Sequence, residues 1–352
     1  MTAPSESSLS APLLTVLVPC YNEAAILRET VAELTEYLEA GHWRGGDAQG
    51  DWEILLVDDG STDDSRGILV ELAGRDSRVR CVSHPFNVGQ GQALQKGFAV
   101  ARGEWIFCVD ADLDYGPEHI ERFLACAENT GAEIVIGSPY MPGGSTSGVP
   151  AMRLFMSRLM NAYFRLVLNL GFATYTSIVR LYRRETIRGL LLTSRDKELL
   201  PEIIIKAALL GVPTVETPAQ LHWKTRNRDQ GRRGASFLSM VRKIVRHLLW
   251  GAMENPMLFF LAPALVVGVG TGWFAIATLV LFLSAYSQAP ASGLAAITIA
   301  ANTVIQANPQ TVVVFVVLLL TTLILLSLSI VILQNKVKRE QDFLYFSRLF
   351  RK

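Results

Sequence analysis

The amino-acid sequence predicts an α/β domain with a Rossmann-like, nucleotide-binding sheet, followed by two transmembrane helices. Three observations predict this architecture. Short apolar segments alternate with amphipathic segments in the first half of the 352-residue chain, and acidic or polar clusters follow several of the apolar segments. No Asp, Glu, Lys or Arg occurs between Met257 and Asn335. Alternating strands and helices are typical of a parallel sheet, and charge-free stretches of this length are typical of membrane spans.

The N-terminal domain should contain strand, loop and helix units in succession. We predict strands over 13–19, 53–57, 79–83, 105–109 and 133–137. Helices are expected after each of the first three strands, and again over 151–170 and 203–210, the first of these two being amphipathic. Because ligands bind beyond the carboxyl ends of the strands in such sheets, the polar clusters found there form the candidate site.

The C-terminal third should cross a membrane twice. The two apolar stretches, 257–286 and 311–334, each exceed the roughly 20 residues that a helix needs to span a bilayer. Basic residues flank both stretches, at 226–246 and 336–352, whereas the connector over 287–310 contains no Lys or Arg. By the positive-inside rule, the N-terminal domain and both termini are cytosolic and the connector lies outside.

We therefore expect a multi-pass protein of the cytoplasmic (inner) membrane, organised in seven parts. These are a flexible N-terminus (1–12), the nucleotide-binding domain (13–235), a juxtamembrane amphipathic helix (236–256), a first span (257–286), an extracytoplasmic connector (287–310), a second span (311–334) and a basic cytoplasmic tail (335–352). No basic residue precedes the short apolar run near the N-terminus, so it does not resemble a signal peptide. The net charge of +1 gives no indication of a nucleic-acid partner, and the basic clusters match anionic lipid headgroups instead.

The strongest chemical signal is the acidic motif Asp110-Ala111-Asp112-Leu113-Asp114, which follows the fourth predicted strand. Carboxylates at alternate positions where a strand opens into a loop can converge on a hard cation. Mg²⁺ or Mn²⁺ held in this way takes its remaining ligands from water and substrate phosphates. An isolated motif of this kind is more often a solvated acidic turn, but here three further loops accompany it.

The three further loops follow the first three strands. They are Pro19-Cys20-Tyr21-Asn22-Glu23, Asp58-Asp59-Gly60-Ser61-Thr62 and Asn87-Val88-Gly89-Gln90-Gly91. Each alone could be a helix cap, but together they place acceptors for a base and a ribose, and a glycine turn, at one sheet edge. A dinucleotide oxidoreductase would instead have GxGxxG directly after the first strand, which this sequence lacks.

These motifs resemble the family 2 glycosyltransferases of the GT-A fold, and more narrowly the polyprenyl-phosphate sugar synthases of the dolichyl-phosphate mannose synthase-like group. The resemblance covers about residues 13–250 and is most specific before Pro117. It implies metal-dependent, inverting transfer of a sugar from a GDP- or UDP-linked donor to polyprenyl phosphate or another lipid acceptor. The number of subunits stays open, and a homo-oligomer is compatible with the sequence.

The resemblance also implies roles for individual residues. The donor nucleotide would be bound by Pro19, Tyr21, Glu23, Asp58, Asp59, Gly89, Asp110, Ala111, Asp112 and Arg232, although the spacing does not decide which of Arg226, Arg228, Arg232 and Arg233 contacts the diphosphate. The metal would be held by Asp110 and Asp112, with Asp114 standing where the family often has a Gln. Besides Asp112, the catalytic residues would be Arg153 and Ser157 at the acceptor phosphate, and Arg180 in the segment Thr176-Ser177-Ile178-Val179-Arg180.

The sequence departs from the family pattern on the acceptor side. Pro139 replaces an Arg, Thr174 replaces an Asp, and Ile178-Val179 replaces Gly-Phe. An ionised lipid phosphate is already a nucleophile and needs no protein base. Transfer to a lipid or glycan hydroxyl would need one, and Asp196, Glu198 or Glu202 are the candidates. A non-catalytic membrane adaptor is the alternative of another class, which the intact acidic residues disfavour.

Overall fold

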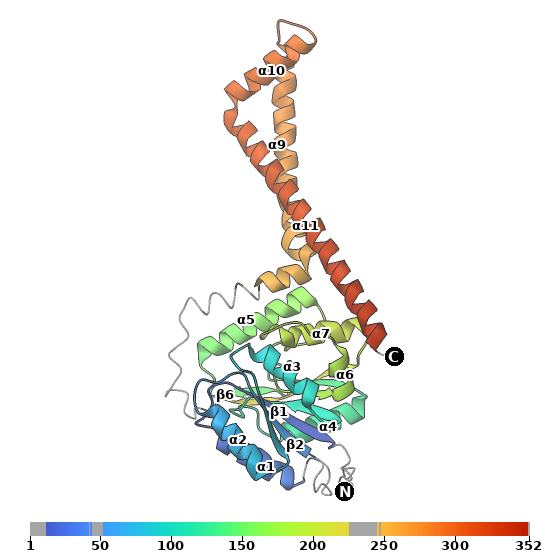
Figure 1. Ribbon diagram of the computed structural model, residues 1–352. Coiled ribbons are helices and arrows are strands. Elements are labelled where there is room, and N and C mark those ends of the chain that lie inside the picture. The colour runs from blue at the N-terminus through green and yellow to red at the C-terminus, as the bar shows by residue number, and fades with distance from the viewer. Residues whose placement is uncertain (1–11, 42, 44–51, 225–244, 246–247, 351–352) are drawn as a thin grey trace. The chain divides into compact units, whose positions relative to one another are not determined.

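The computed structural model describes residues 12–41, 43, 52–224, 245 and 248–350 (Figure 1). The chain divides into two compact units, the first formed by 1–244 with 342–352 and the second by 245–341. Each unit is described by itself. The expected juxtamembrane helix over 236–256 and Arg226, Arg228, Arg232 and Arg233 lie largely or wholly outside the described residues.

The first unit is built on a seven-stranded sheet in the order β3-β2-β1-β4-β7-β5-β8. The strands are β1 (Leu14–Cys20), β2 (Trp52–Asp58), β3 (Val79–Ser83), β4 (Trp105–Cys108), β5 (Ile134–Ser138), β7 (Arg180–Arg183) and β8 (Thr214–Pro218). All neighbouring pairs are parallel except those of β7, which is antiparallel to β4 and β5. The expected α/β fold is confirmed, with one reversed strand that the sequence analysis did not foresee.

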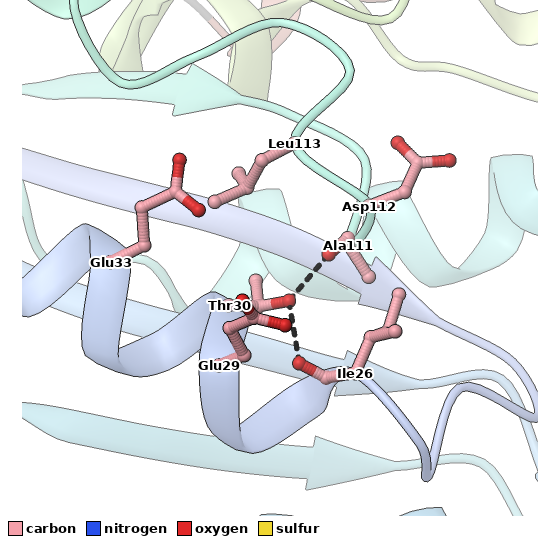
Figure 2. Close-up of a pocket in the computed structure, with 7 residues that line it drawn as sticks. All are labelled: Ile26, Glu29, Thr30, Glu33, Ala111, Asp112 and Leu113. Carbon is pink, nitrogen blue, oxygen red and sulfur yellow. Dashed lines mark hydrogen bonds between the residues drawn. The ribbon is translucent and has the colours of Figure 1, made fainter. Parts of the chain in front are cut away.

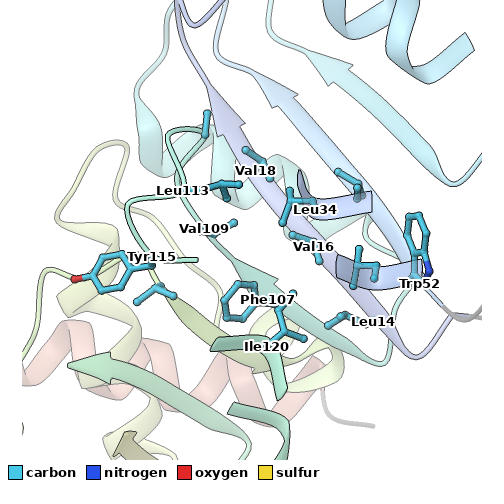
Figure 3. Packing of buried hydrophobic residues seen from close by; sticks show 14 of the residues in the cluster. Leu14, Val16, Val18, Leu34, Trp52, Phe107, Val109, Leu113, Tyr115 and Ile120 are labelled. Atoms are coloured by element: carbon cyan, nitrogen blue, oxygen red, sulfur yellow. The ribbon is translucent and has the colours of Figure 1, made fainter. Parts of the chain in front are cut away.

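The central strands form because their side chains are apolar on both faces, as in parallel sheets covered by helices on each side. In β1, every residue from Leu14 to Val18 is buried. The register pairs Val16 with Ile54 of β2 and with Phe107 of β4. Figure 3 shows Val16 and Phe107 in the buried apolar cluster on one side of these strands.

Seven helices connect or cover the strands in the described part of this unit. They are α1 (Leu27–Glu39), α2 (Ser65–Arg75), α3 (Gln90–Val100), α4 (His119–Thr130), α5 (Ala151–Leu168), α6 (Arg184–Gly189) and α7 (Leu199–Leu209). Helix α5 ends earlier than predicted because Asn169 adopts a left-handed conformation (φ 50°), which terminates helices. A second, two-stranded parallel sheet pairs β6 (Ser145–Ser147) with β9 (Gln220–His222).

The second unit contains the two apolar stretches. A π-helical turn, η3 (Met257–Leu261), leads into α9 (Ala262–Ser287), and α10 (Leu294–Ala307) and α11 (Pro309–Phe350) follow. By length and composition, Met257–Ser287 and Pro309–Ser347 could each cross a membrane, with mean hydropathies of 2.1 and 3.0. Within the expected connector, residues 294–307 are mostly apolar and lack Pro and Gly, and they form α10. The expected basic tail is likewise helical, as part of α11.

Contacts within the second unit join α11 to α9 and to the residues that precede η3. The Thr271 and Thr322 hydroxyls are 3.0 Å apart, and Gly268 of α9 faces the Thr322 methyl group closely enough that an added Cβ would lie 3.6 Å from it. Near residue 254, the Arg339 guanidinium pairs with Glu254 at 3.2 Å. Small and hydroxyl-bearing residues allow helices to pack closely, as at Gly268, Thr271 and Thr322.

Candidate functional site

The loops after β1 and β2 are joined by hydrogen bonds. The Asn22 N–H donates to Ser61 Oγ (3.0 Å), and Asn22 Oδ1 accepts from the Thr62 N–H (2.8 Å). The Glu23 N–H donates to Ser65 Oγ (2.9 Å). Asn22 has a positive φ of 56°, which turns the chain out of β1. The first two clusters that the sequence analysis identified therefore form one continuous surface.

The predicted donor residues of the first loop lie at the edge of that surface. Pro19 is half-buried at the end of β1 and Glu23 is half-buried in the turn before α1. Tyr21 is exposed (38%), so its ring is accessible to a ligand.

Asp58 is fully buried at the end of β2. Its Oδ1 accepts the Ser61 N–H at 2.9 Å. Its Oδ2 is buried without a hydrogen-bond partner among the described residues. Leaving a buried acceptor unpaired costs about 1–3 kcal/mol, so a ligand that donates a hydrogen bond at this position would recover that energy.

Asp59, an expected nucleotide contact, binds the loop over 87–89 in this structure. Its carboxylate accepts hydrogen bonds from the backbone N–H groups of Val88 (3.0 Å) and Gly89 (3.1 Å) and from the Asn87 side chain (2.9 Å). Burial raises the pKa of Asp59, and these N–H donors act in the opposite direction. Asp59 therefore holds the 87–89 loop in place with its carboxylate.

Gly89 and Gly91 allow close packing of the backbone around Arg195. Gly89 has φ 104°, and a Cβ added there would lie 2.7 Å from the Arg195 carbonyl oxygen. A Cβ on Gly91 would lie 2.6 Å from the Asp196 carbonyl oxygen. The Gln92 N–H donates to Arg195 O at 3.1 Å. The glycines thus bring the 195–196 segment, distant in sequence, to the carboxyl edge of the sheet.

The acidic motif forms a tight turn after β4. The Leu113 N–H donates to Asp110 O (3.1 Å), and Leu113 itself has a left-handed φ of 46°. Asp110 Oδ1 accepts from Gln90 Nε2 (3.2 Å), and Ala111 O accepts from the Thr30 hydroxyl (2.5 Å). Figure 2 shows this turn above α1, around a small pocket. The pocket is lined by Ile26, Glu29, Thr30, Glu33, Ala111, Asp112 and Leu113.

The three carboxylates of the motif do not converge. No group of three or more His, Cys, Asp or Glu side chains is placed to hold a metal ion in the part of the chain that the structure describes. Asp114 is buried, and its Oδ1 accepts the Lys224 N–H at 2.9 Å. Oδ1 of Asp114, which the resemblance places at the metal, is thus hydrogen-bonded to the backbone. Asp110 and Asp112 remain, and two carboxylates suit Mg²⁺, which takes its other ligands from water and phosphates.

On the acceptor side, helix α5 carries Arg153 and Ser157. The Tyr140 hydroxyl donates to Ser157 Oγ at 2.7 Å. The Arg153 guanidinium lies over the Trp223 ring, with Cζ 4.1 Å from the ring centroid. Sequence analysis did not identify Tyr140 or Trp223, since neither belongs to a motif or a periodic pattern.

Arg180 does not present its guanidinium to a ligand. The residue is fully buried at the start of β7. Its Nη1, Nη2 and Nε donate to the carbonyl oxygens of Leu200 (2.8 Å), Tyr175 (2.7 Å) and Ser177 (2.8 Å). In the structure, Arg180 thus binds the 175–177 segment to the first turn of α7.

The same segment is fixed from two other directions. Both Glu216 oxygens accept backbone N–H groups, from Ala173 and from Thr174, at 2.7 Å each. Asn161 Oδ1, on α5, accepts the Tyr175 N–H at 2.7 Å. Thr174, which replaces an Asp of the family pattern, has its hydroxyl 2.7 Å from that of Ser138. Two neutral hydroxyl groups, those of Thr174 and Ser138, therefore lie where the family pattern has the carboxylate of an Asp.

Glu202 is poorly suited to act as a general base. Its carboxylate accepts from the Thr193 N–H (2.9 Å) and the Ser194 N–H (2.8 Å), and pairs with Lys206 at 2.6 Å. Burial acts to raise the pKa of Glu202, but Lys206 and the N–H donors outweigh it and lower the pKa. A carboxylate held in this way is a weak proton acceptor, which favours a structural role for Glu202 near the start of α7.

Comparison with known proteins assigns the family. The model of the family described as "Glycosyl transferase family 2" matches residues 15–191, which extend from β1 past α6. The chain belongs to glycosyl transferase family 2. The match includes all four strand-end loops, one of which is the acidic motif, and the α5 residues Arg153 and Ser157.

Two relatives in this family have informative names. The chain is 34% identical over 187 residues to a polyprenol monophosphomannose synthase of Mycolicibacterium smegmatis, covering 52% of this chain and 66% of that protein. It is 36% identical over 129 residues to a dolichyl-phosphate beta-glucosyltransferase of Trichomonas vaginalis, covering 35% of this chain and 38% of that protein. The matched regions therefore span less than two thirds of these relatives.

Among solved structures, the glucosyl-3-phosphoglycerate synthase of Mycobacterium tuberculosis, in complex with Mn²⁺, UDP and phosphoglyceric acid, aligns with a TM-score of 0.48 at 20% identity. The alignment covers 68% of this chain and 78% of that chain.

Proposed function

We propose that this family 2 glycosyltransferase transfers a sugar from a nucleotide-sugar donor to polyprenyl phosphate in a membrane. The observation that carries the proposal is which residues lie on the donor side and which on the acceptor side of the site. On the donor side, Asp58 and the Asp110–Asp112 turn lie at one sheet edge, and Asp58 Oδ2 has no hydrogen-bond partner among the described residues. The acceptor side offers Arg153 and the Ser157 hydroxyl on α5. The names of the two relatives, both of which refer to polyprenol or dolichyl phosphate chemistry, support the same acceptor.

On the donor side, Asp58 would accept a hydrogen bond from the nucleoside, because its Oδ2 is otherwise unpaired among the described residues. Asp110 and Asp112 would hold Mg²⁺ or Mn²⁺, which when bound offsets the charge that develops on the departing diphosphate. Asp59 and Gly89 would act indirectly, by fixing the loop beside the nucleotide. Arg232 stays a candidate contact to the diphosphate from the sequence alone.

On the acceptor side, Arg153 and Ser157 would bind the lipid phosphate and orient one of its oxygens toward the anomeric carbon. That oxygen forms the new bond as the bond from the anomeric carbon to the nucleotide diphosphate breaks, so a single displacement inverts the anomeric centre. No proton has to be removed from an ionised phosphate. The engagement of Glu202 by Lys206 and two N–H donors favours this reaction over transfer to a hydroxyl, which would need a base.

The two apolar helices would place the enzyme at its lipid substrate. We infer that Met257–Ser287 and Pro309–Ser347 contain the spans, with the catalytic unit and both termini in the cytosol, as the basic flanks indicate. In bacteria this membrane would be the cytoplasmic one. The proposed partners are thus a GDP- or UDP-linked sugar, a polyprenyl phosphate and the bilayer.

The test is a sugar-transfer assay with the purified full-length chain, Mn²⁺ or Mg²⁺, undecaprenyl phosphate and a panel of radiolabelled GDP- and UDP-sugars. The expected result is label in a lipid fraction that mild acid releases, and its loss in Asp112→Ala. An acid-stable lipid product would show a glycoside and overturn the phosphate acceptor. Binding of a nucleotide sugar without any labelled lipid would overturn undecaprenyl phosphate as the acceptor and favour a lipid or glycan hydroxyl.

A further inference from the structure

Residues 222–224 continue β9 and run beside the acidic motif. Asp114 contacts this short segment twice, through its backbone and its side chain. Asp114 O accepts the His222 N–H at 2.8 Å, and Asp114 Oδ1 accepts the Lys224 N–H at 2.9 Å. Asp114 itself is only 6% exposed. The third carboxylate of the motif therefore fixes a chain segment 110 residues away in sequence.

The middle residue of the segment, Trp223, belongs to the acceptor side. The backbone N–H of Trp223 donates to Ser147 O of β6 at 2.9 Å. A Cβ added to Gly148 would lie 3.2 Å from the carbonyl oxygen of Trp223. Its ring supports the Arg153 guanidinium, with Cζ 4.1 Å from the ring centroid. A guanidinium over an aromatic face is attracted by the ring, so the Trp223 side chain favours this position of the Arg153 side chain.

Lys224 adds a contact to the donor side. Its Nζ donates to Glu33 Oε1 of α1 at 2.9 Å. Glu33 lines the same pocket as Asp112, as Figure 2 shows. Three consecutive residues thus contact the acidic motif, the helix beneath it, and the arginine that faces the acceptor.

We propose that Asp114 is a positioning residue that anchors residues 222–224, and that this anchor sets the position of Arg153 through the Trp223 ring. The inference rests on the proposed function in that it takes Arg153 to bind the acceptor phosphate. It links donor and acceptor sides: the turn that carries Asp110 and Asp112 also determines, through Asp114, where the acceptor phosphate is held. It also distinguishes Asp114 from a third metal ligand.

The first experiment separates anchoring from metal binding. Mn²⁺ binding in the presence of UDP or GDP is followed by electron paramagnetic resonance on the full-length chain, for Asp114→Asn, Asp114→Ala and Asp112→Asn. Because Asp114 is not a metal ligand in this proposal, we expect wild-type Mn²⁺ affinity in both Asp114 variants. Asp114→Asn also keeps an acceptor for the Lys224 N–H. In Asp112→Asn, Mn²⁺ binding should weaken at least about tenfold. A loss in Asp114→Asn equal to that in Asp112→Asn would make Asp114 a metal ligand and overturn the proposal.

The second experiment tests the link to Arg153. Kinetics are measured with undecaprenyl phosphate as the varied acceptor. We expect Trp223→Ala and Asp114→Ala each to raise the acceptor KM about 3- to 10-fold. Trp223→Phe, which keeps an aromatic face, should restore most of the loss, and Asp114→Asn should resemble the wild type. In the Trp223 variants the donor KM should stay within about twofold, since the Trp223 ring contacts Arg153 on the acceptor side.

The outcomes distinguish this proposal from the proposed function. If Trp223→Ala leaves the acceptor KM unchanged, or if Phe gives no rescue, the link through the ring is wrong even though lipid transfer stands. If the wild type transfers no sugar to undecaprenyl phosphate, the proposed function fails, whereas the Mn²⁺ comparison of Asp114→Asn with Asp112→Asn still decides the role of Asp114.

Discussion

His119 accepts a hydrogen bond at Nε2 from the backbone N–H of Gln220, 3.0 Å away. Its other nitrogen, Nδ1, lies 2.8 Å from Gly116 O and must donate, because a carbonyl oxygen can only accept. The ring is fully buried between Tyr115 and Phe123. His119 must therefore be neutral, and it fixes the start of β9, the strand that leads to residues 222–224.

This contact predicts acid sensitivity. Burial lowers the pKa of His119 below its ordinary value of 6.5; Glu118 opposes this shift, and Arg122 and His222 add to it. The unfolded chain takes up the proton near pH 6.5, before the folded chain does, so stability is lost as the pH falls below about 6.5. Melting temperatures of the full-length protein between pH 7.5 and 5.5 test this. His119→Gln, which can both donate and accept, should flatten the slope; an unchanged slope would contradict the prediction.

Asp58 should determine affinity for the nucleotide. In Asp58→Asn, the Ser61 N–H can keep its acceptor while the unpaired oxygen becomes an NH₂ group. We expect nucleotide-sugar binding to weaken by about tenfold or more, measured by calorimetry with the donor found in the transfer assay. Asp64→Asn is the matched control, because Asp64 is exposed and makes no capping hydrogen bond. Equal affinities in the two variants would exclude a nucleotide contact at Asp58.

Arg180 should contribute to stability. Lys keeps the charge but cannot donate to three carbonyl oxygens in the geometry of the guanidinium. We expect Arg180→Lys to lower the free energy of unfolding by about 2–4 kcal/mol, seen as a lower melting temperature, while exposed Arg158→Lys has little effect. A normal melting temperature together with a large fall in kcat would restore the catalytic role first expected.

Gly89 and Gly131 offer a matched pair of left-handed glycines. Gly131 (φ 68°) has open space where a Cβ would be, whereas a Cβ on Gly89 (φ 104°) would meet Arg195 O at 2.7 Å. Gly131→Ala should cost about 1 kcal/mol from backbone strain alone. Gly89→Ala should cost more and should also weaken nucleotide binding, since Asp59 holds the Gly89 N–H. Equal melting temperatures for the two variants would argue against the close approach.

The direction of the spans can be tested by cysteine labelling in intact bacterial cells. Ser292→Cys lies in the connector between α9 and α10, and a membrane-impermeant maleimide should label it from outside. The half-buried native Cys126 of the catalytic unit is the internal reference, labelled only after the cells are permeabilised. Labelling of Cys126 in intact cells would reverse the proposed orientation.

The first four strands were predictable because a central parallel strand is apolar along its whole length, as β1 and β2 are. Their polar ends could be located for the same reason. Strand β7 could not be predicted: it has four residues, two of them charged at its ends, and its direction depends on pairing with β4 and β5. The sequence analysis assigned no secondary structure to the connector that contains helix α10.

Within the site, the motifs located the residues but not the atoms they contact. Arg180 was expected at the site because it matches the Arg of a family motif, and only the fold shows the three carbonyl oxygens around its guanidinium. Asp114 matched the spacing of a metal ligand, but its partner Lys224 lies 110 residues further along the chain. Contacts at such separations depend on tertiary packing, which local spacing does not report.

The reversed strand β7 has a consequence for protein engineering. It lies between β4, the last of the strands whose ends carry the donor loops, and β5, which precedes the acceptor helix in sequence. Because β7 is antiparallel to both of its neighbours, it forms the boundary between two halves of the sheet. Chimeras of two family members joined at this boundary should therefore fold only if the contacts across it come from one parent, namely Asp114 with residues 222–224 and Gly89 and Gly91 with residues 195–196.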